Sequence, residues 1–198
     1  MSELVLASAS TSRAALLRAA GVAFRVSPAD LDEASLMADL QARGATTAEI
    51  AVRLAAEKAL VVSRREPGAL VLGGDTVVMF QGDLIGKCPD MAGVEALLRR
   101  LSDRGHVLVS GAALARDGAV LWSHASPVRL TMRKLGDAFL ADYLAAEGKA
   151  LLSTVGCYRF EGRGSQLFET VEGDYFSVLG LPLLPVLAAL RKEGVVKS

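Results

Sequence analysis

The chain has few of the residues that mark several common classes of protein. Its two cysteines, Cys88 and Cys157, form no CxxC pair, so we expect free thiols in a reducing cytoplasm. Its two histidines, His106 and His124, belong to no HExxH motif. That scarcity argues against a His-rich metal site and a Ser-His-Asp hydrolase, and both histidines are expected to be structural. The complete GxGxxG dinucleotide fingerprint is also missing.

The chain also lacks an excess of charge and a long apolar run. Its 22 basic and 22 acidic residues cancel, so we expect no nucleic-acid polymer as a partner, although a few local cations can still hold a small anion. Hydrophobic residues make up 52% of the chain, but the longest apolar run, residues 178–190, is broken by Pro182 and Pro185. We therefore expect no membrane partner. The first six residues lack a basic start and a long apolar stretch, so we expect no secretion signal and a cytoplasmic protein.

The hydrophobic segments that are present indicate alternating strands and helices. Strands are expected over residues 4–7, 23–27, 69–80, 106–115 and 119–132, with a short one after a turn at 81–83. Helices are expected over residues 12–20, 46–65, 91–101, 135–146 and 182–193. This order predicts a single α/β domain over residues 1–198, with a mixed, twisted sheet and flanking helices.

Asp75 is the most informative single residue. It follows Gly73-Gly74 at the opening of an apolar, strand-like run, where a carboxylate is costly unless it meets a cation or takes part in proton transfer. The alternative is an aspartate that caps a turn.

The segment Ser8-Ala9-Ser10-Thr11-Ser12-Arg13 joins the first expected strand to the first expected helix. Such loops direct backbone N–H groups at one point, and the helix N-terminus adds partial positive charge. Arg13 in the first turn opposes the helix dipole at a cost of about 0.3–1 kcal/mol, which a bound anion would offset. The alternative is a plain helix cap with a solvated arginine.

Two lysines are further candidates for anion binding. Lys58 lies four residues after Leu54 and three before Val61, on the apolar stripe of its helix, so it either reaches a cleft or extends from the edge of the stripe into water. Lys87 follows Gly86, but the spacing is not that of a P-loop. It could still reach a cleft, although a surface lysine is the more common outcome.

Two acidic segments complete the candidates. Asp30-Leu31-Asp32-Glu33 is either a solvated loop or the source of a second carboxylate for a divalent metal beside Asp75. Residues 160–164, which include Glu161, form either a flexible loop that takes part in a site or a simple turn.

Together these segments resemble the Maf family of nucleoside triphosphate pyrophosphatases over nearly the whole chain. The matching residues occur in order: Leu6-Ala7-Ser8-Ala9-Ser10 with Arg13 and Leu16-Leu17; Gly21 and Phe24; Arg53-Leu54-Ala55 and Glu57-Lys58-Ala59; Gly74-Asp75-Thr76-Val77-Val78; Gly86-Lys87; Leu101-Ser102 with His106; Gly156, Glu161-Gly162 and Gly164; Gly173-Asp174; and Gly180-Leu181-Pro182-Leu183.

The resemblance implies two lobes around a deep cleft, as in Maf and inosine triphosphate pyrophosphatase-like folds, and often a homodimer. It implies hydrolysis of a nucleoside triphosphate to the monophosphate and pyrophosphate with Mg²⁺ or Mn²⁺, and a link to restraint of septum formation. Asp75 would be the catalytic carboxylate, acting either as the general base or as a metal ligand. The phosphate path would be lined by Ser8, Ser10, Arg13, Lys58 and Lys87, and Glu33 would be a further acidic site residue.

The chain departs from the family pattern at two loops and combines two specificity patterns. The usual Ser-Pro-Arg-Arg is Ser10-Thr11-Ser12-Arg13 here, and the usual Gly-Lys-Pro is Gly86-Lys87-Cys88. Thr76 resembles the branch that acts on dTTP and UTP, whereas Glu161 resembles the branch that acts on 7-methyl-GTP. A carboxylate accepts two N–H bonds from a guanine edge, which favours a purine.

We therefore expect a nucleoside triphosphate pyrophosphatase that removes non-standard or surplus nucleotides. The main alternative is a nucleotide-binding regulator of cell division with little catalysis, which the altered residues Thr11 and Ser12 keep open. A phosphotransferase is a third option, weakened by the lack of a recognised loop or nucleophile.

Overall fold

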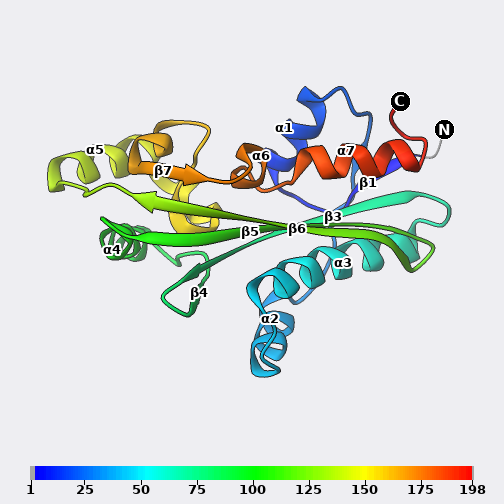
Figure 1. The fold of residues 1–198 in the computed structure, drawn as a ribbon, viewed down its shortest axis with the longest axis horizontal. Coiled ribbons are helices and arrows are strands. Elements are labelled where there is room, and N and C mark those ends of the chain that lie inside the picture. The colour runs from blue at the N-terminus through cyan, green and yellow to red at the C-terminus, as the bar shows by residue number, and fades with distance from the viewer. Residues whose placement is uncertain (1–2, 198) are drawn as a thin grey trace. The chain divides into compact units, whose positions relative to one another are not determined.

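The computed structural model describes residues 3–197, which form a mixed seven-stranded sheet with helices packed on it (Figure 1). The strands are β1 (Leu4–Leu6), β2 (Arg25–Val26), β3 (Leu70–Phe80), β4 (Asp83–Ile85), β5 (Gly105–Arg116), β6 (Ala119–Met132) and β7 (Phe168–Glu172). The helices are α1 (Thr11–Ala19), α2 (Glu33–Ala42), α3 (Thr47–Arg65), α4 (Met91–Leu101), α5 (Asp137–Glu147), α6 (Tyr175–Val178) and α7 (Leu183–Lys192).

The strand order is β2-β1-β3-β5-β6-β7, with β4 beside β3. The β1 strand is parallel to β2 and β3, whereas β4 pairs with β3, and β7 with β6, in the antiparallel direction. The predicted α/β class with a mixed sheet is therefore confirmed. Within the described residues, no helix is both long and apolar enough to span a membrane.

The chain divides into two compact units. Unit 1 comprises Met1–Thr76, Val109–Ser126 and Asp174–Ser198, and unit 2 comprises Val77–Leu108 and Pro127–Gly173. Strands β3, β5 and β6 each pass from one unit to the other.

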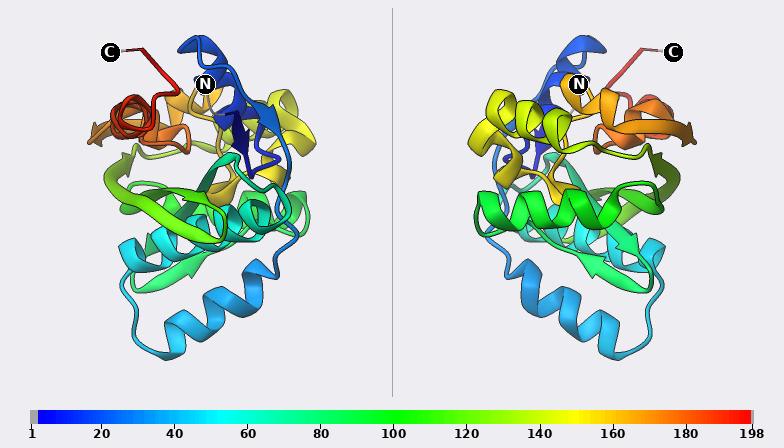
Figure 2. Two further views of the ribbon diagram at one scale, coloured as in Figure 1. Left: turned by 90° about the vertical axis from the view of Figure 1, so that its right-hand side faces the viewer. Right: turned by 90° about the vertical axis from the view of Figure 1, so that its left-hand side faces the viewer.

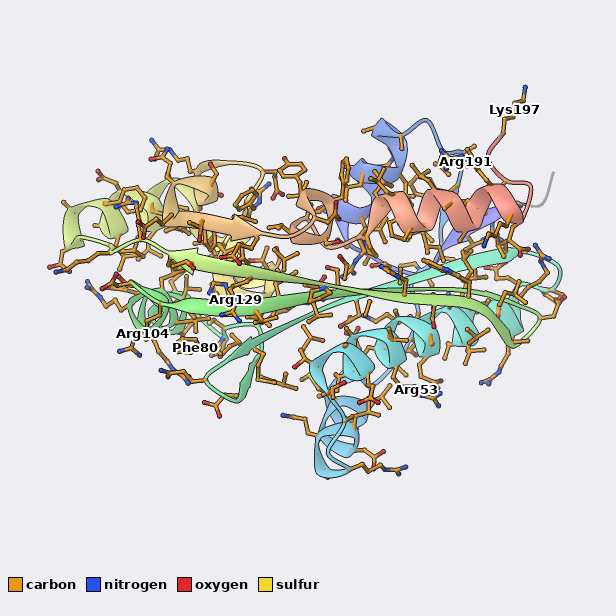
Figure 3. All side chains as sticks on the ribbon, in the orientation of Figure 1. Arg53, Phe80, Arg104, Arg129, Arg191 and Lys197 are labelled. Atoms are coloured by element: carbon orange, nitrogen blue, oxygen red, sulfur yellow. The ribbon has the colours of Figure 1, made fainter. Side chains whose placement is uncertain are left out.

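Unit 1 is layered, with helices on both faces of its part of the sheet (Figures 1 and 2). Because successive strand residues point to opposite faces, Leu4 and Leu6 of β1 join the core under α1 and α7. Val5, between them, joins the core under α3. Arg53 on α3 and Arg191 on α7 point away from the sheet on their respective sides (Figure 3), as expected for amphipathic helices.

Helix α3 contacts the backbone of two strands directly, because each presents a glycine to it. A Cβ on Gly73 of β3 would overlap the carbonyl oxygen of Ala55 and come within 2.9 Å of the backbone nitrogen of Ala59. A Cβ on Gly111 of β5 would overlap the carbonyl of Ala51 and come within 2.8 Å of the backbone nitrogen of Val52. The bare backbone at these two positions sets the distance between α3 and the strands.

The predicted start of α3 is confirmed, and its buried stripe is slightly corrected. The Thr46 side chain accepts from the Glu49 backbone and the Glu49 side chain from the Thr46 backbone, which completes a capping box. The buried face runs through Ile50, Leu54 and Lys58 to Val62, whereas Val61, which we expected on the stripe, is partly exposed. A spacing of four residues continues the stripe to Val62 rather than Val61.

Three other elements differ from the sequence prediction. Helix α2, which begins at the end of the acidic segment 30–33, and strand β7 were not predicted. The predicted strand at residues 23–27 is reduced to the two residues of β2.

Unit 2 contains α4, α5, β4, β7 and three short 3₁₀ segments, η1 (Gly148–Ser153), η2 (Val155–Cys157) and η3 (Arg163–Leu167). His106 on β5 is 2% exposed, and its Nε2 lies 2.9 Å from the hydroxyl oxygen of Tyr158. Its Nδ1 is buried and has no hydrogen-bond partner among the described residues. Burial lowers the pKa of His106 to about 4, so the ring is neutral at pH 7.

We expect His106 to make the protein less stable in mild acid. Between pH 6.5 and about 4 the unfolded chain protonates this histidine and the folded chain does not, so stability falls as the pH falls through that window. The loss should reach about 3 kcal/mol. Urea unfolding at pH 7.5 and pH 4.5 measures it, and His106→Asn, which cannot titrate, should have the smaller pH dependence. Parallel pH profiles for the two proteins would contradict this assignment.

Candidate active site

Asp75 lies inside β3 rather than in a turn, so its interpretation as a turn cap is wrong. Its residue is 7% exposed, and its Oδ1 accepts a hydrogen bond of 2.6 Å from Nζ of Lys58. Lys58 binds Oδ1, and Oδ2 receives no hydrogen bond from the described part of the chain. The pair thus leaves one carboxylate oxygen for a further partner.

Lys58 is buried on α3 and contacts two carboxylates. Its Nζ lies 2.6 Å from Asp75 Oδ1 and 2.8 Å from Glu33 Oε2. It therefore does not extend from the stripe's edge into water. Burial raises the pKa of Asp75, and the positive charges of Lys58 and Arg13 lower it in part. Removing one partner of such a buried pair costs about 3–5 kcal/mol because the other charge is left uncompensated.

The two neighbouring acids of the 30–33 segment have different contacts. Asp32 caps α2, because its Oδ1 accepts 3.0 Å from the Ser35 backbone and its Oδ2 accepts 2.7 Å from the Ser35 hydroxyl. Glu33 instead reaches Lys58 from the first turn of α2, with its side chain 52% exposed. Of the two, Glu33 is the acid that shares an ammonium with Asp75.

Arg13 is a buried guanidinium held by neutral oxygens. Its Nη1 donates to Ser8 Oγ at 3.0 Å, its Nη2 to Thr76 Oγ1 at 3.0 Å, and its Nε to the carbonyl of Gly180 at 2.8 Å. The residue is 8% exposed, and burial lowers its pKa against the raising effects of Asp75 and Glu33. Arg13 is thus not a solvated side chain at a helix start. Ser10 caps α1, because its side-chain oxygen accepts from the Arg13 backbone N–H.

The structure adds two residues that the sequence analysis did not single out as site residues. Ser110 on β5 donates to the carbonyl of Ser177 at 2.7 Å and lies 3.1 Å from Thr76 Oγ1. Gly180, at φ +100°, supplies the carbonyl that receives Arg13 Nε. In the sequence, Ser110 stands out as the hydroxyl residue within the apolar run of β5, and this pattern could have identified it as a candidate. Gly180 occurs only within the family match.

Two predicted site residues belong to unit 2. Lys87 is exposed just after β4. Glu161 precedes η3, and its Oε1 lies 3.8 Å from an Arg159 guanidinium nitrogen. The seven residues that the structure brings together in unit 1 are Ser8, Ser10, Arg13, Glu33, Lys58, Asp75 and Thr76.

The donor atoms of this site suit a hard divalent cation. Asp75 and Glu33 bring carboxylate oxygens to within 2.6 and 2.8 Å of one ammonium. Within residues 3–197 no group of three His, Cys, Asp or Glu side chains is arranged as a metal cage. Mg²⁺ is commonly held by one or two carboxylates together with substrate phosphates, so two carboxylates are a sufficient protein contribution.

Comparison of the whole chain with known families shows which class this α/β fold, with its buried Lys58–Asp75 pair, belongs to. The model of the Maf-like protein family matches residues 3–193, and the chain belongs to that family. The 7-methyl-GTP pyrophosphatase of Brucella abortus is 45% identical, with 98% of each chain covered. That of Mesorhizobium japonicum is 46% identical, again over 98% of each chain. The nucleoside triphosphate pyrophosphatase of Granulibacter bethesdensis is 45% identical over 96% of this chain and 97% of its own.

Proposed function

We propose that this protein is a nucleoside triphosphate pyrophosphatase, which hydrolyses a nucleoside triphosphate to the monophosphate and pyrophosphate and so removes non-standard or modified nucleotides. The observation that carries the proposal is the buried Asp75 carboxylate 2.6 Å from the Lys58 ammonium, in a member of the Maf family. The matching names of relatives about 45% identical over nearly the full length support the same activity.

The reaction breaks the anhydride bond between the α-phosphorus and its bridging oxygen. Water attacks the α-phosphorus, its proton passes to a base, and the bridging oxygen leaves with the pyrophosphate. Asp75 suits the role of base because Lys58 binds only Oδ1, which leaves Oδ2 for the attacking water. Lys58 and Arg13 favour the ionised form of Asp75 that this role requires.

The positive charges and hydroxyls near Asp75 suit the phosphates. Arg13 has five N–H groups, and three of them are used by Ser8, Thr76 and Gly180, which leaves two for phosphate oxygens. Ser8 and Ser10 lie at the start of α1, where the helix dipole adds partial positive charge. By the family resemblance we also assign Lys87 to the phosphate path. Such groups stabilise the charge that develops on the leaving pyrophosphate.

Asp75, with Glu33, would hold the Mg²⁺ or Mn²⁺ that the family resemblance implies. When bound, the ion would neutralise phosphate charge and polarise the phosphoryl oxygens. The homodimer that the resemblance implies and the cytoplasmic location expected from the sequence belong to the same proposal.

For the base we propose a purine, with 7-methyl-GTP as the preferred candidate. A carboxylate such as Glu161 accepts two N–H bonds from a guanine edge, whereas uracil and thymine offer one donor and two acceptors. The relatives from Brucella abortus and Mesorhizobium japonicum carry the name 7-methyl-GTP pyrophosphatase. Thr76 is the residue that resembles the dTTP and UTP branch. Its hydroxyl oxygen accepts from Arg13 and contacts Ser110. These contacts do not depend on which nucleobase is bound.

The test is pyrophosphate release from 7-methyl-GTP, dTTP, UTP and ITP, each with Mg²⁺ and with Mn²⁺. We expect release from 7-methyl-GTP at a kcat/KM at least about 10-fold above that for UTP, because a site that hydrogen-bonds a guanine edge discriminates against a base that leaves those bonds unmade. The other product should be the nucleoside monophosphate.

Release of inorganic phosphate in place of pyrophosphate would contradict the proposed cleavage. Nucleotide binding without any release would favour the regulator, with Ser12, where the family has arginine, as the first residue to test. Preference for UTP or dTTP would be consistent with the pyrophosphatase activity but would overturn the proposal that Glu161 selects a purine.

A further inference from the structure

The two cysteines of the chain are far apart in sequence and adjacent in unit 2. Cys88 follows Lys87 after β4, and Cys157 ends η2. Cys157 Sγ lies 3.0 Å from Cys88 Sγ and donates its S–H to it. Both are free thiols. A disulfide needs the two sulfurs at about 2.05 Å, so they have to approach by only about 1 Å.

The two thiols have different access to water. Cys88 is half-buried and accepts the S–H hydrogen bond, whereas Cys157 is fully buried. The partial exposure of Cys88 lets a reagent reach its sulfur. Burial and the neighbouring Cys88 raise the pKa of Cys157 to about 12, so Cys157 keeps its proton until a disulfide partner has formed beside it. Cys88 is therefore the sulfur that reacts first.

Local structure holds the second sulfur in place. Cys157 has φ +58°, a left-handed conformation that is uncommon for a residue with a side chain, and Gly156 before it has φ +79°. A Cβ on Gly156 would come within 2.6 Å of the Tyr158 ring. In this backbone conformation the Cys157 thiol lies against that of Cys88. The pair uses the position where the family pattern has proline, and none of the proposed steps of hydrolysis needs it.

We propose that Cys88 and Cys157 form an oxidative modification site, which a low-molecular-weight disulfide such as glutathione disulfide converts to an intramolecular disulfide.

The chemistry balances in two exchange steps. The Cys88 thiolate attacks one sulfur of glutathione disulfide, the S–S bond of the reagent breaks, and one glutathione thiolate leaves and takes up a proton. Cys157 then gives up its proton and attacks Sγ of Cys88, which breaks the mixed disulfide and releases the second glutathione. The protein loses two electrons and two hydrogens, and one glutathione disulfide is reduced to two molecules of glutathione.

The test treats the reduced, full-length protein with excess glutathione disulfide and then counts thiols after denaturation. We expect the two free thiols to fall to none, the intact mass to fall by two hydrogens, and a peptide that links residue 88 to residue 157. Dithiothreitol should restore both thiols. Two thiols that remain after excess reagent, or linkage only between chains, would overturn the proposal.

Two single variants test the order of attack. Cys157→Ser keeps the half-buried thiol and should accumulate a stable mixed disulfide with glutathione. Cys88→Ser keeps the buried thiol and should remain unmodified in the native state. Glutathione uptake by Cys88→Ser as fast as by Cys157→Ser would overturn the assignment of Cys88 as the attacking sulfur. Because the main measurement uses the unaltered protein, poor folding of either variant leaves the proposal testable. A failure of pyrophosphatase activity would not affect any of these results.

Discussion

Replacing Asp75 with Asn should lower the rate of pyrophosphate release by at least about 10³-fold while the chain remains folded. Asn has nearly the shape of Asp and can still accept the Lys58 hydrogen bond through its amide oxygen, but it can neither take a proton from water nor bind a metal as a carboxylate does. The buried ammonium keeps Glu33 as a partner at 2.8 Å, which limits the loss of stability. Rates with the best substrate and thermal unfolding measure the two effects.

The matched control is Asp137→Asn. Asp137 is an exposed aspartate that pairs with Arg99 on the surface, and its loss should leave the rate unchanged. A rate for Asp75→Asn within a few-fold of the wild-type rate would contradict the assignment of Asp75 as the catalytic carboxylate. A metal titration of the same variant then separates two roles. Partial recovery at high Mn²⁺ identifies a metal ligand, whereas no recovery identifies the base.

The second large effect is on stability, and we expect it from Gly111→Ala. The added Cβ would overlap the Ala51 carbonyl on α3, in backbone that no side-chain rotation can move away. Overpacking of this kind costs about 3 kcal/mol, which lowers the melting temperature by about 6–12 °C for a chain of this length. Because α3 carries Lys58, displacement of the helix should also reduce the rate of the protein that stays folded.

Gly86→Ala is the control for this effect. Gly86 is exposed, has no atom within 4 Å of a built Cβ and has no positive φ, so its stability should change by less than about 0.5 kcal/mol. Gly73→Ala should behave like Gly111→Ala, because its Cβ would overlap the Ala55 carbonyl. Equal melting temperatures for Gly111→Ala and Gly86→Ala would show that α3 can move away from the sheet at no cost.

The sequence predicted best where one local pattern determined the structure. Helix α4 (Met91–Leu101) and strand β6 (Ala119–Met132) have the predicted bounds, and the capping box of α3 was visible as Thr46 and Glu49. Lys58 was placed on the buried face because its position follows from helical spacing alone. In each case the residues that decide the structure lie within a few positions of one another.

The sequence failed to predict elements with a weak hydrophobic pattern and contacts between residues that are far apart in the chain. Helix α2 buries none of its residues, so it has no apolar stripe to recognise, and β7 is a mostly exposed strand at the end of the strand order. The sequence offered Arg13 as an anion-binding residue or a solvated side chain, and it gave no indication that the Arg13 Nε donates to the carbonyl of Gly180, 167 residues away. No local spacing contains that pairing. It depends on how α1 and α7 pack on the same face of the sheet.

The two carboxylates on Lys58 differ in how firmly the fold holds them. Asp75 belongs to a buried strand, so moving it requires disruption of the sheet. Glu33 is the first residue of α2, a helix in which no residue is buried. Segments with few buried contacts open at a small free-energy cost. The ammonium is therefore shared between a fixed anion and a releasable one. If Lys58 lies on the phosphate path as proposed, an incoming phosphate would displace Glu33 from Lys58 by competition alone, with the core intact.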